Sequence, residues 1–327
     1  MGESRSSSSR AAETSGRRLR VNQSRSGPLI SLGLDVPPLE AGRPGDPGLF
    51  GPDSMVWRVG RERVLLAGGP AAVLLQIAHP LVAAGVADHS GFRADPLRRL
   101  QATLEATLRI TFGDERQARE AAEQVATVHG RVRGRLRRAV GPFPAGTPYD
   151  ARSPELALWV HATLVATALR VHDRFVSPLS LADRERYYEE VKPFARSFGV
   201  EDDVLPADYR AFRTYVARMV AGPQIAVGDD AGDLADQILR PPVALAARPA
   251  IPAIHAVTAW LLPPKLREGF GLPWGLRERA LVSALGPPVR LAIKGLPAGL
   301  RYWPHVRIAL ERVAKSGNEQ VRSRVFH

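Results

Sequence analysis

The sequence predicts an all-α protein built as a single large helical domain. Segments of helix length with an apolar stripe follow one another from Asp53 almost to the C-terminus. Two of them begin with strong helix-start signals, Asp95-Pro96 and Ser153-Pro154, in which a capping side chain precedes a proline at the first helical position. No stretch alternates β-branched and polar residues as strands do, so we expect almost no sheet.

The expected helices are defined by their apolar pattern and by the prolines and glycines between them. In order, they span residues 56–66, 70–79, 81–87, 96–112, 115–140, 154–175, 182–198, 206–221, 229–247, 249–262, 276–285 and 302–315.

The stretch 65–87 is apolar except for Gln76 and His79. Its length alone resembles a transmembrane helix. Pro70, Pro80 and a Gly-Gly pair interrupt it, and each proline removes a backbone donor and breaks or kinks a helix. We therefore expect two short buried helices that meet near His79 and line a deep apolar cavity.

The ends of the chain differ in composition from the helical part. Residues 1–50 form a basic lead-in rich in Pro and Gly that we expect to be disordered, 51–315 the helical domain, and 316–327 a C-terminal tail. No apolar segment follows the twin arginine Arg17-Arg18, so we expect a cytoplasmic protein.

Composition excludes several kinds of chemistry. The 327 residues are 45% apolar and include no cysteine, which excludes disulfides, thiolate ligation of haem, iron–sulfur clusters and covalent haem attachment. The motifs HExxH, GxSxG, GxGxxG, the Walker loop and the Glu-x-x-His pair of di-iron bundles are absent. Haem is still allowed, because it needs one axial imidazole and a large apolar slot.

The net charge of +12 lies mostly at the two ends, since residues 1–27 and 301–327 carry +4 each. The remaining +4 is ordinary for a chain of this size, so no nucleic-acid partner is expected. A weak contact of the basic tails with a membrane surface is the alternative.

His161 lies in the middle of the helix expected at 154–175. Its neighbours on the same face are Ala157, Leu158, Leu164 and Val165. One interpretation is a buried core histidine. The other is an axial ligand of haem iron, with Leu164 and Val165 contacting the cofactor.

Three other histidines are weaker candidates. Charged neighbours place His172 at the surface. His79 precedes Pro80, so it caps carbonyls freed at a helix end or, alternatively, belongs to the haem-binding residues. His89 lies in an expected turn.

Arg99, Thr103, Thr107 and Thr111 follow one another at four-residue spacing on the helix expected at 96–112. Threonine is a poor helix former, so this row is either a solvated face or a polar wall of the cavity. In the second case Arg99 supplies a positive charge beside bound dioxygen or pairs with a haem propionate, and Thr103 supplies a hydroxyl. The arginines between 131 and 138 are interpreted as a solvated face.

Five segments carry a resemblance to a known family. They read DSMVWRVGRERVLLAGGPAAVLLQIAHPLVAAGVADHS, FRADPLRRLQAT, GTPYDARSPELALWVHATL, RERYYEEVKPFARSFGV and LLPPKLREGFGLPWG. Together they resemble the bacterial oxygenase MpaB family, which is related to latex-clearing (rubber) oxygenases and to the fungal enzyme that cleaves a farnesyl chain in mycophenolic acid synthesis.

The resemblance implies an all-α, globin-reminiscent core with non-covalent haem b, which oxidatively cleaves a carbon–carbon double bond in an apolar substrate. By motif position, His161 corresponds to the proximal ligand of rubber oxygenases, and Arg99 and Thr103 to a distal arginine and threonine. The distal lysine of rubber oxygenases falls at Ala102, so that ligand is missing here. No residue is assigned to their catalytic carboxylate.

The first hypothesis is therefore a haem b-dependent oxygenase that activates dioxygen at histidine-ligated iron and acts on a small apolar, unsaturated or isoprenoid-like substrate. The second is a non-catalytic haem-binding or apolar-ligand-binding protein, which Ala102 favours. The third is an adaptor that binds membrane or nucleic acid through its arginine-rich tails.

We predict that residues 1–27 are dispensable for folding, because eight serines and six arginines offer too little apolar surface to offset the entropy of ordering. Deleting them should leave the melting temperature unchanged in a thermal unfolding experiment. A large drop in melting temperature would contradict this interpretation.

Overall fold

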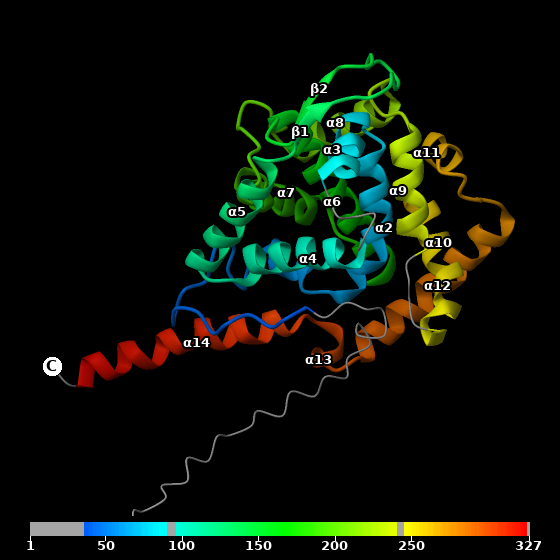
Figure 1. Ribbon diagram of the computed structural model, residues 1–327. Helices are drawn as coiled ribbons and strands as arrows, with labels where there is room; N and C mark the ends of the chain where they lie inside the picture. Colours follow the sequence, from blue (N-terminus) through cyan, green and yellow to red (C-terminus); the bar gives the residue numbers. More distant parts are fainter. Residues whose placement is uncertain (1–35, 90–95, 241–244, 326–327) are drawn as a thin grey trace, which may run out of the picture.

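The computed structural model describes residues 36–89, 96–240 and 245–325, with the backbone alone at 96–99, 245–247 and 316–325. It confirms the all-α class (Figure 1), since helices make up most of the described chain and the two short strands pair in one antiparallel hairpin. The expected disorder of residues 1–27 lies outside the described residues. A globin-like arrangement of the helices stays a prediction.

The elements have the following bounds. They are α1 (Met55–Gly60), the 3-10 helix η2 (Arg63–Gly68), α2 (Gly69–Ile77), α3 (Pro80–His89), α4 (Pro96–Phe112), α5 (Glu115–His129), β1 (Arg133–Arg135), β2 (Pro148–Asp150), α6 (Pro154–Phe175), α7 (Leu181–Ser197), α8 (Tyr209–Ala221), α9 (Asp229–Leu239), the 3-10 helix η4 (Leu245–Ala250), α10 (Ile251–Leu261), α11 (Pro264–Gly269), α12 (Leu276–Gly295), α13 (Ala298–Arg301) and α14 (Pro304–Val325).

Helix α6 occupies the centre of the fold. It begins as its start signal predicts, because the Ser153 side chain accepts a hydrogen bond from the Leu156 N–H. Helices α1, α2, α7, α8 and α12 and the 3-10 helix η2 pack around it. Buried residues therefore occur along its whole length rather than on one stripe.

Helices α2 and α3 meet at His79, as the prolines predict. Within the described ranges, no single helix is both long and apolar enough to cross a membrane. The segments Arg63–Ile77 and Pro80–His89 reach that length and composition only as a pair, across a bend of 105°. The sequence predicted that His79 caps carbonyls at the end of a helix, but it caps the start of the next helix instead. Its Nδ1 accepts a hydrogen bond from the Leu81 N–H at 3.3 Å, at the start of α3, instead of donating to carbonyls at the end of α2.

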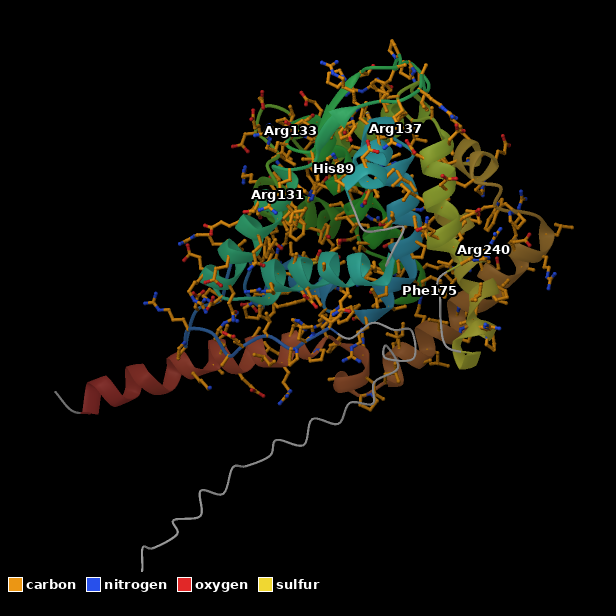
Figure 2. All side chains as sticks on the ribbon, viewed as in Figure 1. His89, Arg131, Arg133, Arg137, Phe175 and Arg240 are labelled. Atoms are coloured by element: carbon orange, nitrogen blue, oxygen red, sulfur yellow. The ribbon has the colours of Figure 1, made fainter. Side chains whose placement is uncertain are left out.

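The prediction of one helix over residues 115–140 is wrong beyond His129. After His129 the chain turns at Gly130 and forms the hairpin of β1 and β2. Gly134 allows Tyr149 to lie against β1, because a Cβ at 134 would come within 2.4 Å of the Tyr149 hydroxyl oxygen. The arginines of this segment occur at every second residue, which is the period of a strand. They are exposed as expected, and Figure 2 shows Arg131, Arg133 and Arg137 around the hairpin.

Helix α12 runs past Pro287-Pro288 to Gly295, although the prolines predicted an end at residue 285. A proline leaves the carbonyl four residues earlier without its helical donor. The carbonyl affected by Pro287 is that of Ser283, and the Arg174 Nη2 donates to it at 3.2 Å and to the Val282 carbonyl at 2.7 Å. A hydrogen bond from α6 thus compensates the loss.

Residues 36–50, the described part of the lead-in, pack against the helical domain, whereas disorder was expected for residues 1–50. Leu39 is buried in a cluster with Trp303 and Ala309. Arg312 of α14 is 2% exposed, and its guanidinium donates to the Asp46 carbonyl at 2.8 Å and the Phe112 carbonyl at 3.0 Å. Helix α14 also continues to Val325, past the expected end at 315.

We predict that Arg312→Met destabilises the protein by about 2–4 kcal/mol, because a buried carbonyl and a part-buried carbonyl lose a charged donor. Urea unfolding should show this loss, and limited proteolysis should show new cleavage between residues 36 and 50. Arg307→Met is the matched control, since Arg307 is exposed on the same helix and forms an ion pair with Glu311. Equal stability of both variants would show that Arg312 does not hold the lead-in.

Candidate functional site

A deep, mostly apolar cavity lies between η2, α2, α4, α6 and α7. The cavity volume is about 270 Å³, within a wider hollow of about 1520 Å³ that opens to solvent. No Asp, Glu, Lys or Arg side chain lines it in the described part of the chain. The apolar cavity expected around residues 65–87 is therefore present, and α2 contributes Ala72, Val73 and Ile77 to its wall.

His161 of α6 is the one imidazole among the described lining residues. It is 4% exposed, and neither ring nitrogen has a hydrogen-bond partner among the described residues. Its nearest ring contact is Phe194 of α7, with 5.9 Å between centroids. Burial lowers the pKa of His161 to about 4, so the imidazole is neutral at pH 7. Such a buried polar group without a partner is uncommon in proteins, and His161 differs from the other buried groups of this kind in that it is a neutral imidazole in the wall of a cavity.

Of the four residues expected beside His161 on α6, Leu164 and Val165 line the cavity, whereas Ala157 and Leu158 pack in a separate cluster with Ala195 and Val200. Ala168, seven residues after His161, also lines the cavity. Thr167 also lines it, but its hydroxyl donates to the Thr163 carbonyl at 2.7 Å. This wall is thus apolar apart from the imidazole.

The threonine row of α4 forms the facing polar wall. Thr103, Thr107 and Thr111 all line the cavity, with Thr103 exposed and Thr111 only 5% exposed. The row therefore leads from solvent into the interior. Thr107 donates to the Thr103 carbonyl at 2.8 Å. The side chain of Arg99, the other residue predicted here, lies outside the described residues.

Three further lining residues escaped the sequence reasoning about the site. Gln76 of α2 reaches the cavity and donates to the Thr163 hydroxyl at 3.1 Å. Tyr187 of α7 lies in the wall, and burial raises the pKa of its phenol. Trp303, between α13 and α14, closes another side. Gln76 could have been found, because it interrupts an apolar stretch, whereas nothing in the local pattern marks Tyr187 or Trp303.

The structure does not bring His79 to this cavity. His79 is buried against Phe143, with 5.3 Å between ring centroids, and lines a separate surface hollow beside β1 and β2. Burial lowers its pKa to about 4. His89 is exposed, and its Nε2 lies 2.9 Å from the Arg133 carbonyl oxygen.

The surface position predicted for His172 is wrong. His172 is 2% exposed, and its Nδ1 lies 3.0 Å from the Ser177 carbonyl oxygen. Its charged neighbours turn away to other partners, Asp173 to Arg184 of α7 and Arg174 to carbonyls of α12. His172 does not line the cavity, so it is a structural residue.

A comparison with protein families matches most of the chain. The sequence model of the family described as "ER-bound oxygenase mpaB/B'/Rubber oxygenase, catalytic domain" matches residues 57–291. The chain belongs to this family. All described lining residues of the cavity except Val56 and Trp303 fall within the part matched by the mpaB/rubber oxygenase domain.

Two mycobacterial proteins are similar to the chain over most of their length. The uncharacterized proteins Mb2261 of Mycobacterium bovis and Rv2237 of Mycobacterium tuberculosis are each 28% identical to it over 236 residues, which is 70% of this chain and 89% of theirs. No solved structure matches the chain.

The buried histidines predict an acid-sensitive fold. Burial lowers the pKa of His79, His161 and His305 to about 4, from an ordinary value of 6.5. Between these values the unfolded chain binds protons that the folded chain excludes. The stability from these groups is therefore complete above pH 6.5 and is lost as pH falls toward 4.

Urea unfolding of haem-free protein between pH 4.5 and 7.5 checks this expectation. The three histidines together should add a slope of up to about 4 kcal/mol per pH unit, and His161→Gln should remove about a third of it. Identical slopes for His161→Gln and the unchanged protein would show that His161 is not protonated on unfolding in this range.

Proposed function

We propose that this oxygenase-family protein is a haem b-dependent oxygenase in which the His161 imidazole would bind the iron, and that its substrate is an apolar, unsaturated or isoprenoid-like compound. The observation that carries the proposal is the neutral, unpartnered imidazole of His161 in the wall of an apolar cavity. A neutral ring nitrogen is what haem iron takes from a histidine.

The residues present fit this cofactor. No group of three or more His, Cys, Asp or Glu side chains able to hold a metal ion occurs in the described part of the chain. An iron ion beside His161 would therefore need most of its ligands from a macrocycle. Leu164 and Val165 would contact such a group, and Arg99 would pair with a propionate or act beside dioxygen. When bound, haem supplies a redox-active iron for the reaction of dioxygen with a double bond.

The residues of the chain would bind the substrate and position polar groups around it. The apolar lining of α2 and α6 excludes water, which strengthens each polar contact inside. The Thr103 hydroxyl, on the facing wall, is proposed to donate a hydrogen bond to oxygen in the cavity. Cytoplasmic location stays a prediction, as does the absence of a nucleic-acid partner.

A non-catalytic haem-binding or apolar-ligand-binding protein is the second candidate. Two observations favour it: Ala102 stands where rubber oxygenases have a lysine, and no carboxylate lines the cavity in the described residues. Dioxygen consumption by the purified protein with an unsaturated terpenoid separates the two. Binding of the terpenoid without any consumption of dioxygen would favour the second candidate.

We predict that the protein purifies with non-covalent haem and that His161→Ala loses most of it, since no cysteine can replace the imidazole. The Soret absorption per mole of protein, with acid–butanone extraction, measures occupancy. A colourless protein that takes up no added haemin would end the proposal.

Three variants serve as controls for the assignment. His172→Ala and His79→Ala should keep haem while lowering stability, because both residues are buried outside the cavity. Arg99→Ala should keep haem and slow turnover if its charge acts on oxygen. Full occupancy in His161→Ala, with loss in His79→Ala, would move the iron to the junction of α2 and α3.

A further inference from the structure

Helix α12 presents a largely apolar face without carboxylates to the outside of the molecule. Its inner face packs through Val282, Gly286 and Ile293, which are buried. Leu291 follows Val282 by nine residues, or two and a half helical turns, so it points in the opposite direction and is 74% exposed. The other exposed residues of this outer face are the small or apolar Ala280, Ala284, Pro287, Pro288 and Gly295 and the two cations Arg277 and Lys294.

The exposed apolar surface continues beyond the end of the helix. Leu296 is 40% exposed and Leu300 is 51% exposed, and Pro297 and Ala298 between them are exposed as well. Leu291, Leu296 and Leu300 are named here the leucine patch. Exposed apolar surface of this kind, where it is contiguous, marks an interaction site more often than an ordinary surface.

A basic hollow borders the leucine patch. Arg174, Arg290 and Lys294 line it together with Gly286, Pro287 and Leu291, so it holds three cations and no carboxylate in the described chain. Gly286 makes room for the first cation, because a Cβ there would come within 2.7 Å of the Arg174 guanidinium. The hollow belongs to the packing of α6 against α12 and is not a loose surface cluster.

Some N–H groups of the two arginines in this hollow donate hydrogen bonds, and others have no partner in the described chain. Arg290 donates through Nη2 to the carbonyls of Asp173 and Arg174 at 2.8 and 3.0 Å, and Arg174 donates to carbonyls of α12. The Nε atoms of both arginines are buried and have no partner among the described residues. The Asp173 carboxylate does not neutralise them, because it binds Arg184 and the Leu179 N–H. The hollow therefore carries unbalanced positive charge.

Three kinds of binding partner can be compared by how well they fit both the basic hollow and the leucine patch. A free anion would neutralise the hollow but leave the leucine patch in water. An apolar protein surface would cover the leucines but desolvate three cations without compensation. An anionic bilayer satisfies both, since its phosphates lie at the depth of the cations and its acyl boundary receives the leucines.

We propose that the outer face of α12, the basic hollow and the leucine patch dock on an anionic phospholipid bilayer, with a headgroup phosphate bound by Arg174, Arg290 and Lys294. The surface is independent of haem, so the proposal goes beyond the proposed chemistry and does not rest on it. Arg174 follows His161 by thirteen residues on α6, a distance of about 20 Å along the helix. Docking would thus hold the cavity close to a phase that dissolves apolar substrates.

Vesicle flotation with the full chain tests the proposal. The protein should float with vesicles of mixed phosphatidylcholine and phosphatidylglycerol, and not with phosphatidylcholine alone. Lys294→Gln should weaken binding about fivefold, the effect of one cation near an anionic surface. Leu291→Ser should weaken it roughly tenfold, because one leucine no longer enters the acyl boundary. Both residues are exposed, so thermal unfolding of the variants should be unchanged.

Matched controls lie on other elements. Val128→Ser replaces an apolar residue of α5 that is 60% exposed, and Arg133→Gln removes an exposed cation of β1. Figure 1 places both elements away from α12. Neither change should alter flotation. Equal losses in Arg133→Gln and Lys294→Gln would show unspecific attraction of a basic protein and would overturn the proposal.

Two further outcomes would also overturn it. Inorganic phosphate could raise the melting temperature of the protein, with this effect lost in Lys294→Gln, while no vesicle binds; the hollow would then be a site for free anions. Sedimentation could show a dimer that disappears in Leu291→Ser, again without flotation; the leucine patch would then pair two copies of this chain.

Discussion

The burial of α6 on all sides is the constraint on which the rest of the structure depends. Six elements pack around this helix, and a Cβ at Gly68 of η2 would come within 2.9 Å of the Val171 side chain. The polar groups of α6 that are buried by this packing cannot reach water, so each needs a partner inside the protein. Trp159 donates to the Leu75 carbonyl at 3.1 Å, and Thr163 accepts from Gln76 at 3.1 Å.

His161 is the exception among the buried polar side chains of α6. Thr167 and His172 each pair with a carbonyl oxygen, whereas both nitrogens of His161 lack a partner in the described chain. The difference lies in the surroundings, because Thr167 and His172 lie within hydrogen-bond reach of a backbone carbonyl and His161 does not. Under the proposed function, a group bound in the cavity would offset the cost of burying this imidazole without a partner.

The closure of the cavity depends on contacts between the two ends of the domain. Glu62 is 1% exposed, and Arg301 donates to both of its carboxylate oxygens, with Nη2 at 2.6 Å. The backbone of Glu62 also pairs with Tyr302, which separates α1 from η2 where one helix was expected. Trp303 follows directly and lines the cavity. This wall lies beyond residue 291, where the family match ends, so it is a feature of this chain outside the shared domain.

The sequence by itself determined two kinds of feature, namely where certain helices begin and which reactive side chains are present. Capping residues and prolines determined where α4, α6 and the α2–α3 junction begin, since these signals act within one helical turn. The absence of cysteine excluded thiolate ligands and disulfides, and the presence of His161 on an apolar helix face suggested a histidine-bound cofactor. Tertiary structure decided the rest, because the deciding contacts join residues far apart in the chain. Arg174 allows α12 to continue through Pro287-Pro288, and the packing of α6 against its neighbours buries His172 while leaving His161 without a partner in an apolar cavity.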